Sequence, residues 1–364
     1  MRVLHVVNSM ANVGNGIVNA TVDLACTQSR AGHEVVVASS GGAFVDLLRR
    51  SGVRHETISL RRAPGSMLKT LRRLRALIDE VRPDVVHAHV MTAAVLAWLL
   101  RPFVRARYGT VSTVHNEFRR DAVLMGLADR VVAVSGAVGV SMARRGIPER
   151  KIRVVNNGTL GSPRRLPAAD VAAKALQRPA VTTIAGMYER KGIAELIEAF
   201  GAVSPAHGAH LYLVGAGPDE AWFRSLARTS AGHDRIHFEG FQAEPASYLV
   251  SSDVFVLASR AEPCGLVISE AREAGCAIVA TAVGGNPEQL DGGAAGTLVA
   301  PRDPASLAAA IEQLLRDPGA LEDARRRARS QLETFRVERV AAQTVAVYDE
   351  LLALRKTVGQ RATP

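Results

Sequence analysis

Short apolar runs alternate with helical patterns along this chain of 364 residues, and the alternation occurs in two separate series. Strands that alternate with helices pair in parallel, because each right-handed crossover brings the chain back in the same direction. The predicted strands of the first series lie near residues 3–7, 34–38, 85–88, 109–114, 130–134 and 152–156. Those of the second series lie near residues 181–185, 210–214, 236–239, 254–257, 277–281 and 296–299. The pattern predicts an α/β protein with two Rossmann-like parallel-sheet domains.

A polar, proline-containing stretch at residues 157–167 separates the two series. We therefore predict a first domain over residues 1–165, a second over residues 166–345, and a C-terminal helix and tail over residues 346–364. Hydrophobic residues make up 48% of the chain, which is enough for two cores and excludes a largely disordered protein.

The three cysteines, Cys26, Cys264 and Cys276, lack a metal-type spacing, so no structural zinc site is expected. Their low number suits a reducing compartment, and we expect Cys264 to be a buried packing residue rather than a reactive thiol. The first residues have the pattern of a strand rather than a leader peptide, and no segment reaches the roughly 18 apolar residues of a membrane span. We predict a cytoplasmic protein that can also attach to the inner face of the plasma membrane.

The net charge of +10 is unevenly distributed. Residues 1–165 hold 25 Lys and Arg against 11 Asp and Glu, whereas residues 166–364 hold 20 against 24. Residues 98–108 interleave aromatic and basic side chains, a mixture that favours contact with an anionic membrane. A second basic group comprises Arg61, Arg62, Lys69, Arg72, Arg73 and Arg75. The alternative is a solvated surface, and without a nucleic-acid motif the charge does not indicate a nucleic-acid partner.

Two carboxylates, Glu262 and Glu270, flank the junction between the predicted strand at 254–257 and a helix that begins at Gly265. Open α/β sheets bind ligands at this edge, and the first N–H groups of a helix attract phosphate. We therefore expect the N–H groups of Gly265, Leu266 and Val267 to face a phosphate. Gly265 would also let the ligand approach closely, while Glu262 lies in the same crevice and Glu270 accepts hydrogen bonds from a ribose.

Arg190 and Lys191 follow the strand at 181–185, at a second strand end in the same domain. These cations could form charge-assisted hydrogen bonds to a diphosphate and offset the two carboxylates. The alternative is that both are solvated residues of a turn.

Several motifs occur in a fixed order. The second half carries Gly186 to Gly192, Leu213 to Pro218, Phe238 to Phe241 and Asp253 to Glu270, and the first half carries Asp84 to His89, Ser112 to His115, Val132 to Ser135 and Asn157-Gly158. In this order the motifs resemble the retaining GT-B glycosyltransferases of family 4 over nearly the whole chain. The resemblance implies two domains that face each other across a cleft, with the last helix returning to the first domain.

The resemblance also implies roles for the first domain. Gly16, in a loop that lacks the third glycine of a dehydrogenase fingerprint, matches the glycine whose N–H contacts the donor diphosphate. His115 is placed at the donor sugar, where it could donate to a hydroxyl or stabilise developing charge. His87 and His89 are assigned structural or cleft-wall roles. Met187 departs from the pattern, because many relatives carry an arginine directly after the glycine.

The implied reaction moves a sugar from a UDP- or GDP-linked donor to a glycan or polyprenyl-linked acceptor, as in bacterial surface polysaccharide or glycolipid synthesis. Retention by a front-face route, with His115, Glu262, Arg190 and Lys191 at the reacting groups, fits better than double displacement. No Asp-x-Asp pair occurs in the sequence, so we predict a reaction that needs neither metal nor cofactor. A GT-B sugar-nucleotide epimerase and a catalytically silent scaffold that binds membranes or partners remain alternatives. The nucleobase contact is expected near Phe241 and Gln242, and it does not distinguish uracil from guanine.

Overall fold

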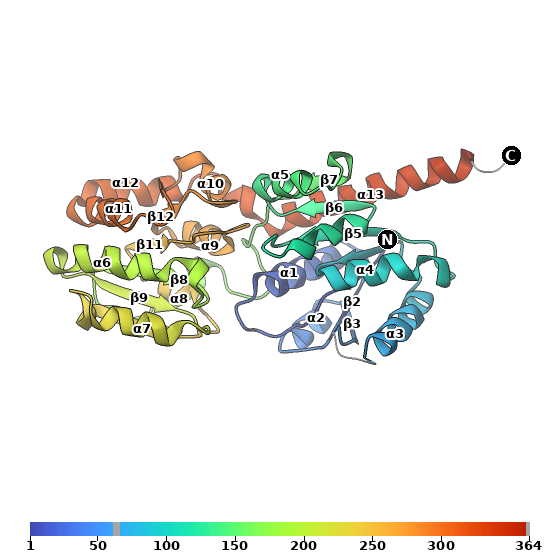
Figure 1. Cartoon of the computed structure of the whole chain (residues 1–364), viewed down its shortest axis with the longest axis horizontal. Coiled ribbons are helices and arrows are strands. Elements are labelled where there is room, and N and C mark those ends of the chain that lie inside the picture. The colour runs from blue at the N-terminus through green and yellow to red at the C-terminus, as the bar shows by residue number, and fades with distance from the viewer. Residues whose placement is uncertain (61–65, 362–364) are drawn as a thin grey trace. The chain divides into compact units, whose positions relative to one another are not determined.

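The computed structural model describes residues 1–60 and 66–361, and the chain divides into two compact units (Figure 1). The first unit comprises Met1–Asn157, Gly161–Arg164 and Arg336–Pro364, and the second comprises Gly158–Leu160 and Arg165–Phe335. Each unit is built on one parallel sheet. The α/β fold with two Rossmann-like parallel-sheet domains, predicted from the alternating pattern, is confirmed.

The first sheet has the strand order β3-β2-β1-β4-β5-β6-β7, and all its pairs are parallel. The strands are β1 (Arg2–Val6), β2 (Glu34–Ser39), β3 (Arg54–Thr57), β4 (Val85–Ala88), β5 (Gly109–Val114), β6 (Arg130–Ala133) and β7 (Ile152–Val154). The order reverses between β1 and β4, where His5 lies directly beside His87 in the register. Open α/β sheets bind ligands at such a reversal, beyond the carboxyl ends of the strands.

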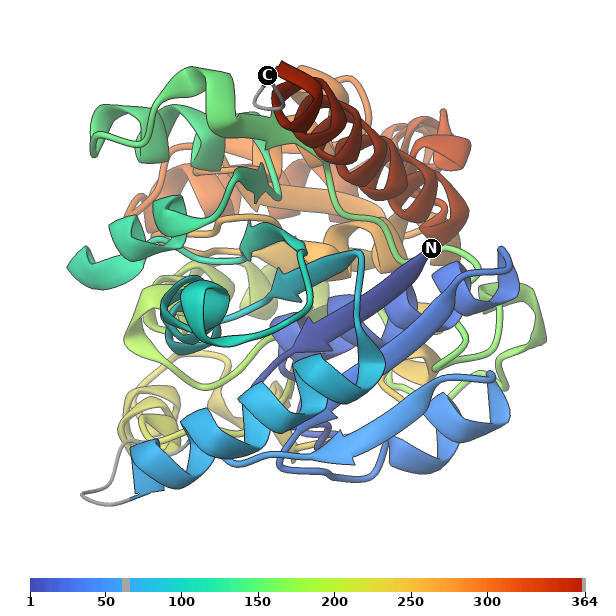
Figure 2. The same ribbon diagram turned by 90° about the vertical axis from the view of Figure 1, so that its right-hand side faces the viewer.

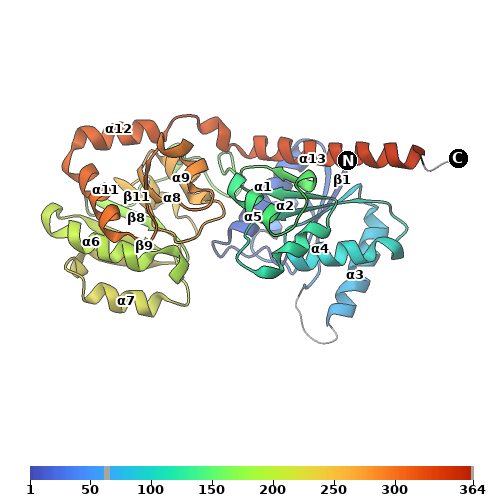
Figure 3. The same cartoon turned by 45° about the horizontal axis from the view of Figure 1, so that its top comes forward.

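The α-helices of the first unit are α1 (Gly16–Arg30), α2 (Val45–Arg50), α3 (Ser66–Val81), α4 (Met91–Leu100), α5 (Gly136–Arg144) and α13 (Val337–Arg361). Helix α13 packs Tyr348 and Leu351 against the apolar residues Val3, Val85 and Val111 of the central strands. Figure 2 shows this helix beside the strands of the first unit, and Figure 3 shows its length. The first unit therefore includes residues 336–345, which the sequence-based division assigned to the second domain.

The second sheet has the order β10-β9-β8-β11-β12-β13, again with parallel pairs. Its strands are β8 (Ala180–Ile184), β9 (His210–Val214), β10 (Ile236–Gly240), β11 (Val254–Leu257), β12 (Ala277–Thr281) and β13 (Thr297–Val299). Its α-helices are α6 (Ile193–His207), α7 (Glu220–Arg228), α8 (Ala246–Leu249), α9 (Leu266–Ala274), α10 (Asn286–Gln289), α11 (Pro304–Arg316) and α12 (Pro318–Ala328). The order reverses between β8 and β11, and the loops after these two strands carry Lys191 and Glu262.

Every strand predicted from the sequence is present, with ends that differ by at most two residues. Strand β3 was not predicted, because its sequence Arg-His-Glu-Thr lacks apolar alternation. It forms the edge of the first sheet, where Arg54 is exposed. An edge strand of this kind is held by backbone pairing to β2 rather than by a buried side-chain pattern.

Candidate functional site

The loop after β8 is pressed against the end of β11 in the second unit. Gly192 ends the short turn that carries Lys191 and has a φ of 67°, in the left-handed region that favours glycine. A Cβ atom at Gly192 would lie 1.8 Å from the carbonyl oxygen of Ala258, so only glycine permits this approach. The N–H of Arg260 also donates to the carbonyl oxygen of Arg190 at 2.8 Å. These contacts bring the Lys191 loop and the Glu262 loop together.

Lys191 and Glu262 form an ion pair within this contact. The ammonium donates to Oε2 of Glu262, and the hydroxyl of Ser259 donates to the same oxygen at 3.1 Å. The side chains are only 15% and 9% exposed, so each charge depends on the other for compensation. Lys191 was predicted to bind a diphosphate and Glu262 to lie near a sugar, and in the structure the two side chains are in direct contact.

Arg190 takes a different position from its neighbour. It is exposed, and its guanidinium lies 5.2 Å from the ring centroid of Tyr188. Arg260, which sequence reasoning did not assign, organises the loop instead: its guanidinium donates to Glu195 at 2.6 Å and also pairs with Glu189. Met187 is fully buried in the core of the second unit, so the position after Gly186 is a packing position in this chain.

Helix α9 begins next to the Glu262 loop, with Gly265 as its N-cap residue. The N–H of Leu266, one of the three expected to face a phosphate, donates to the carbonyl oxygen of Cys264 at 2.9 Å. A Cβ atom at Gly265 would lie 2.9 Å from Oδ1 of Asn286, so this side chain would have to shift to admit a larger residue. The N–H of Leu266 is thus engaged within the turn, and the phosphate contacts of Gly265, Leu266 and Val267 stay a prediction.

Cysteine positions differ in part from the expectation. Cys26 and Cys276 are buried, whereas Cys264 is partly exposed. The side-chain amide of Gln289 donates to Sγ of Cys264 at 3.3 Å. The expectation that Cys264 is a buried packing residue is therefore wrong in its burial, because the residue lies in the loop before α9 rather than under a helix.

Glu270 lies in the second turn of α9 beside a cation that sequence reasoning missed. Nε of Arg165 is 3.9 Å from Oε1 of Glu270, and both side chains are less than one-fifth exposed. The same guanidinium donates to Glu273 at 2.5 Å and to the carbonyl oxygen of Thr159 at 3.0 Å. Nε of Arg165 is buried and has no hydrogen-bond partner among the residues that the structure describes. The only signal in the sequence was a basic residue at the end of the linker.

Gly16 and His115 belong to the first unit. Gly16 is exposed and opens α1, where Oδ1 of Asn15 accepts the N–H of Ile17 at 2.9 Å. His115 directly follows β5, as predicted. It lines a cavity of about 470 Å³, together with His89, Thr113, Asn8 of the β1–α1 loop and residues of η2 (Arg120–Leu127).

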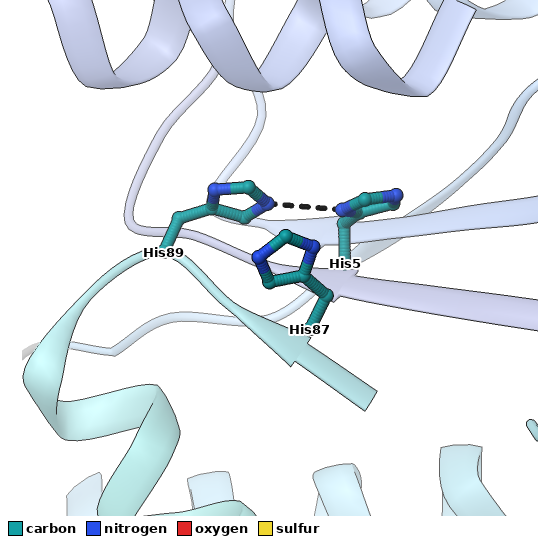
Figure 4. A group of neighbouring side chains, drawn as sticks. All are labelled: His5, His87 and His89. Atoms are coloured by element: carbon teal, nitrogen blue, oxygen red, sulfur yellow. Dashed lines mark hydrogen bonds between the residues drawn. The ribbon is translucent and has the colours of Figure 1, made fainter. Parts of the chain in front are cut away.

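Behind His115 lies a group of buried imidazoles (Figure 4). Nδ1 of His5 and Nε2 of His89 are 2.9 Å apart, and Nδ1 of His89 is 3.1 Å from Nε2 of His115. At the other end, Nε2 of His5 is 2.8 Å from Oε1 of Gln28. His87, from the same strand end as His89, contacts the hydroxyl of Tyr348 at 2.5 Å and that of Thr113 at 2.7 Å. His5 joins His87 and His89 in this group of contacts, and the structural or cleft-wall role implied by the resemblance stays a prediction.

Burial keeps these imidazoles uncharged. It lowers the pKa of His5 to about 4, and it holds the pKa values of His87 and His89 well below their ordinary value. His115 is partly exposed as a residue, yet burial of its ring lowers its pKa to about 4. At neutral pH each ring therefore has one nitrogen that donates and one that accepts.

A second cavity of about 760 Å³ lies at the opposite edge of the first sheet, near the amino ends of β5, β6 and β7. Its charged lining residues are Arg101, Arg105, Arg107, Asp129, Arg130, Arg150, Lys151 and Arg355. Seven cations thus surround one carboxylate. Burial lowers the pKa values of Lys151 and Arg355, and neighbouring arginines add to the effect. The arrangement favours an anion.

Comparison with known proteins identifies the family. Residues 14–159 match the family described as Glycosyltransferase Family 4, and residues 178–317 match Glycosyl transferases group 1. A glycogen synthase of Mycobacterium tuberculosis (strain ATCC 25618 / H37Rv) is 31% identical over 288 residues, which cover 73% of this chain and 69% of the synthase. This chain belongs to glycosyltransferase family 4. The resemblance inferred from the order of motifs is confirmed.

The glycosyltransferase also matches more distant proteins along nearly its whole length. N-acetyl-alpha-D-glucosaminyl L-malate synthase of Bacillus anthracis is 25% identical, over 93% of this chain and 94% of the synthase. The structure of HepE from Anabaena in complex with UDP-glucose has a TM-score of 0.82 and 21% identity, covering 96% of this chain and all of HepE. The predicted GT-B fold is confirmed. Within the described part of the glycosyltransferase, every helix is too short or too polar to cross a bilayer.

Proposed function

We propose that this glycosyltransferase moves a sugar from a UDP- or GDP-linked donor to a glycan or polyprenyl-linked acceptor, with retention at the anomeric carbon. The observation that carries the proposal is the nearly buried ion pair of Lys191 and Glu262 beside the start of α9. Buried ion pairs are seldom a source of stability, and open α/β sheets bind ligands at the carboxyl ends of their strands, where this pair lies. The complexes of HepE with UDP and with UDP-glucose support a nucleotide-sugar donor.

In the proposed site, Lys191 shares its ammonium between Glu262 and the diphosphate. As the bond between the anomeric carbon and the diphosphate oxygen breaks, negative charge grows on that oxygen. A lysine that is already positioned in a dry site stabilises this charge without reorganisation, and the N-terminal end of α9 adds a smaller contribution. Arg190, which is exposed and lies over the ring of Tyr188, is proposed as a second contact to the diphosphate.

The acceptor oxygen forms its bond on the same face of the sugar from which the diphosphate leaves. Its proton passes to the departing phosphate oxygen, so no separate protein base is required. Glu262 is then proposed to contact the sugar rather than to act as a covalent nucleophile, because its carboxylate is held by Lys191 and Ser259. Glu270, next to Arg165, is proposed to accept a hydrogen bond from the ribose.

Positive charge for the leaving group comes in this scheme from side chains and a helix terminus, so the reaction is proposed to need no metal. The experiment is a thermal-shift series with UDP-, GDP- and ADP-sugars, followed by transfer assays in excess EDTA. A ligand at about 100 times its dissociation constant raises the free energy of unfolding by about 2.7 kcal/mol. The anomeric coupling of the product in NMR tests retention. No shift with any nucleotide sugar, or a metal-reversible loss in EDTA, contradicts the corresponding part.

The acceptor side carries a second proposal, that the first unit contacts anionic membrane where a lipid-linked acceptor is found. The membrane contact was predicted from two basic groups, of which Arg61 and Arg62 lie outside the described residues. Among the described residues, seven cations line the 760 Å³ cavity. Near it, Trp98 is 44% exposed and Phe103 is 62% exposed, as expected for side chains that insert into an interface.

A further inference from the structure

The hydrogen bonds that run from Tyr348 to His115 have a direction, and Gln28 sets it. Nε2 of Gln28 donates to the hydroxyl of Tyr348 at 3.3 Å, which leaves Oε1 to face Nε2 of His5. An amide oxygen can only accept, so His5 must carry its proton on Nε2. Its Nδ1 is then the acceptor.

The tautomer of each neutral imidazole determines the tautomer of the next one in the chain of hydrogen bonds. Because Nδ1 of His5 accepts, the proton of His89 must lie on Nε2, 2.9 Å away. Nδ1 of His89 then accepts, and the proton of His115 must lie on Nε2, 3.1 Å away. Nδ1 of His115 is left without a proton, and no described residue bonds to it.

We propose that Tyr348, Gln28, His5 and His89 form an imidazole relay that fixes His115 in the tautomer whose Nδ1 is a hydrogen-bond acceptor. These four are positioning residues, since they act on a ligand only through His115. The role of His115 towards a sugar rests on the proposed function, whereas its tautomer does not. In this tautomer His115 accepts a hydrogen bond from a hydroxyl, and it neither donates one from Nδ1 nor carries positive charge.

In the same direction, a side branch runs from Tyr348 to Thr113 through His87. The hydroxyl of Tyr348 receives the amide proton of Gln28 and donates its own proton to Nδ1 of His87 at 2.5 Å. Nε2 of His87 then donates to Thr113 at 2.7 Å. Burial raises the pKa of the Tyr348 hydroxyl, so this donor keeps its proton. Reversal of the relay would require the amide, the hydroxyl and all the imidazoles to change together.

A metal centre is the competing interpretation of His5, His87 and His89, whose potential ligand atoms lie within 4.8 Å of one another. A metal requires lone pairs that converge from different directions in the planes of the rings. The rings of His87 and His89 are instead stacked, with centroids 4.3 Å apart and an interplanar angle of 28°. Figure 4 shows His5 and His89 edge to edge along their hydrogen bond. The geometry therefore favours the relay.

The test is two-bond proton–nitrogen NMR of the full chain with nitrogen-15 in its histidines, which separates protonated from bare ring nitrogens. His115→Gln assigns the signal. We expect His115 to be neutral from pH 5.5 to 8, with its proton on Nε2. A proton on Nδ1, or a doubly protonated ring near pH 6, overturns the relay. Equimolar zinc in the purified protein, with both nitrogen shifts altered on its removal, would replace the relay with a metal centre.

Two variants test the origin of the direction. Tyr348→Phe removes the hydroxyl that orients Gln28, so a second His115 signal with the proton on Nδ1 should appear. Tyr108→Phe is the matched control, because this buried hydroxyl donates to Ala97 at 2.7 Å outside the relay. Thr113→Val leaves the Nε2 proton of His87 without an acceptor and should move the His115 proton to Nδ1. Spectra of both variants that match wild type overturn the assignment of direction to Tyr348.

The functional role of His115 has a separate measurement. His115→Ala should weaken binding of the nucleotide sugar more than binding of the nucleoside diphosphate alone. Only the nucleotide sugar carries the hydroxyl of the transferred sugar, from which His115 would accept a hydrogen bond. Equal weakening of both would remove His115 from the sugar and leave the tautomer result standing. No binding of either ligand to wild type would instead contradict the proposed function.

Discussion

The two units place polar groups at the carboxyl edges of their sheets in opposite electrostatic forms. In the first unit the group is a chain of uncharged imidazoles, and in the second it is an ammonium in contact with a carboxylate. In the neutral chain His5 and His89 each have a donor and an acceptor partner, whereas the ion pair is tolerated only while both charges remain. The same topological position can therefore provide either a fixed direction or a compensated charge.

The largest effect is expected from removing Lys191, the cation of the second unit's ion pair. Lys191→Ala should raise the barrier to transfer by about 2 to 4 kcal/mol, as for loss of a preorganised donor. It also leaves Glu262 buried without its partner, so the second unit should lose about 3 to 5 kcal/mol of stability. Single-turnover kinetics and denaturant unfolding measure the two effects separately.

The double variant Lys191→Ala with Glu262→Gln separates stability from catalysis. An amide needs no counter-charge, so the double variant should recover stability and remain slow. Lys174→Ala is the control, because this exposed lysine lies 3.7 Å from Glu239 in the same unit. If Lys191→Ala transfers sugar as fast as Lys174→Ala, the charged site in the second unit has no part in the reaction.

Acid should act on the neutral chain of the first unit. The folded pKa of His5 is about 4 and its ordinary value is 6.5, so the unfolded chain binds the proton first as the pH falls. The contribution of neutral His5 to the free energy of unfolding is fully present above about pH 6.5. It is lost progressively towards pH 4, by about 3 kcal/mol for His5 alone. Hydrogen exchange of amides in β1 and β4 at pH 4.5 and pH 7 measures this loss.

His5→Gln provides the comparison for the acid effect. The amide does not titrate, so the variant should be less stable at pH 7 and should show a shallower dependence on pH. An unchanged slope would mean that protonation of the imidazole chain does not limit the stability of the first unit.

The sequence predicted those features whose signal is local. The run Val254–Leu257 is apolar and short, and Gly265 and Gly275 bound the next helix, so the strand, the loop and the position of Glu262 followed directly. Lys191 was found because it ends a loop of the same kind. Their mutual contact was not predicted, since it depends on the approach of Gly192 to Ala258.

The relay could not be predicted, because its members are far apart in the chain. Gln28 and Tyr348 are 320 residues apart. Each lies in a helix, α1 and α13, and no motif around either residue indicates a buried polar contact. His5 has the appearance of a strand residue, and only its register beside His87 shows that polar groups are continuous across the sheet. Arg165 was missed for a similar reason, since nothing in the linker indicates that it reaches Glu270.

A smaller effect is expected at Glu270, where the charged site meets the nucleotide. Glu270→Gln should weaken nucleoside diphosphate binding by about 1.5 to 3 kcal/mol, the usual range for a hydrogen bond to a charged group. Glu262→Gln should instead slow sugar transfer. Glu273→Gln is the matched control, because Glu273 also pairs with Arg165. Calorimetric titration measures the affinity of each variant for the nucleoside diphosphate. If Glu262→Gln binds it more weakly than Glu270→Gln does, the two assignments are reversed.

The smallest effect concerns the basic cavity, and it asks whether the charge of the first unit acts at a surface rather than at the reacting groups. Each basic residue near an anionic bilayer contributes about 1 kcal/mol, so Arg105→Glu or Arg107→Glu should weaken liposome binding by at least that amount and leave donor binding unchanged. Arg72→Glu, on α3 in the other basic group, is compared with these variants to show which of the two basic groups contacts the bilayer.

Co-sedimentation with liposomes should require anionic lipid and weaken with salt, since charges are screened over roughly 8 Å at physiological ionic strength. Chemical modification of Arg105 is also measured with inorganic pyrophosphate and with anionic liposomes. If pyrophosphate protects Arg105 to the same extent as the liposomes, the ligand of the cavity is a free anion. Equal recovery on neutral and anionic liposomes would show that the cations are a solvated surface.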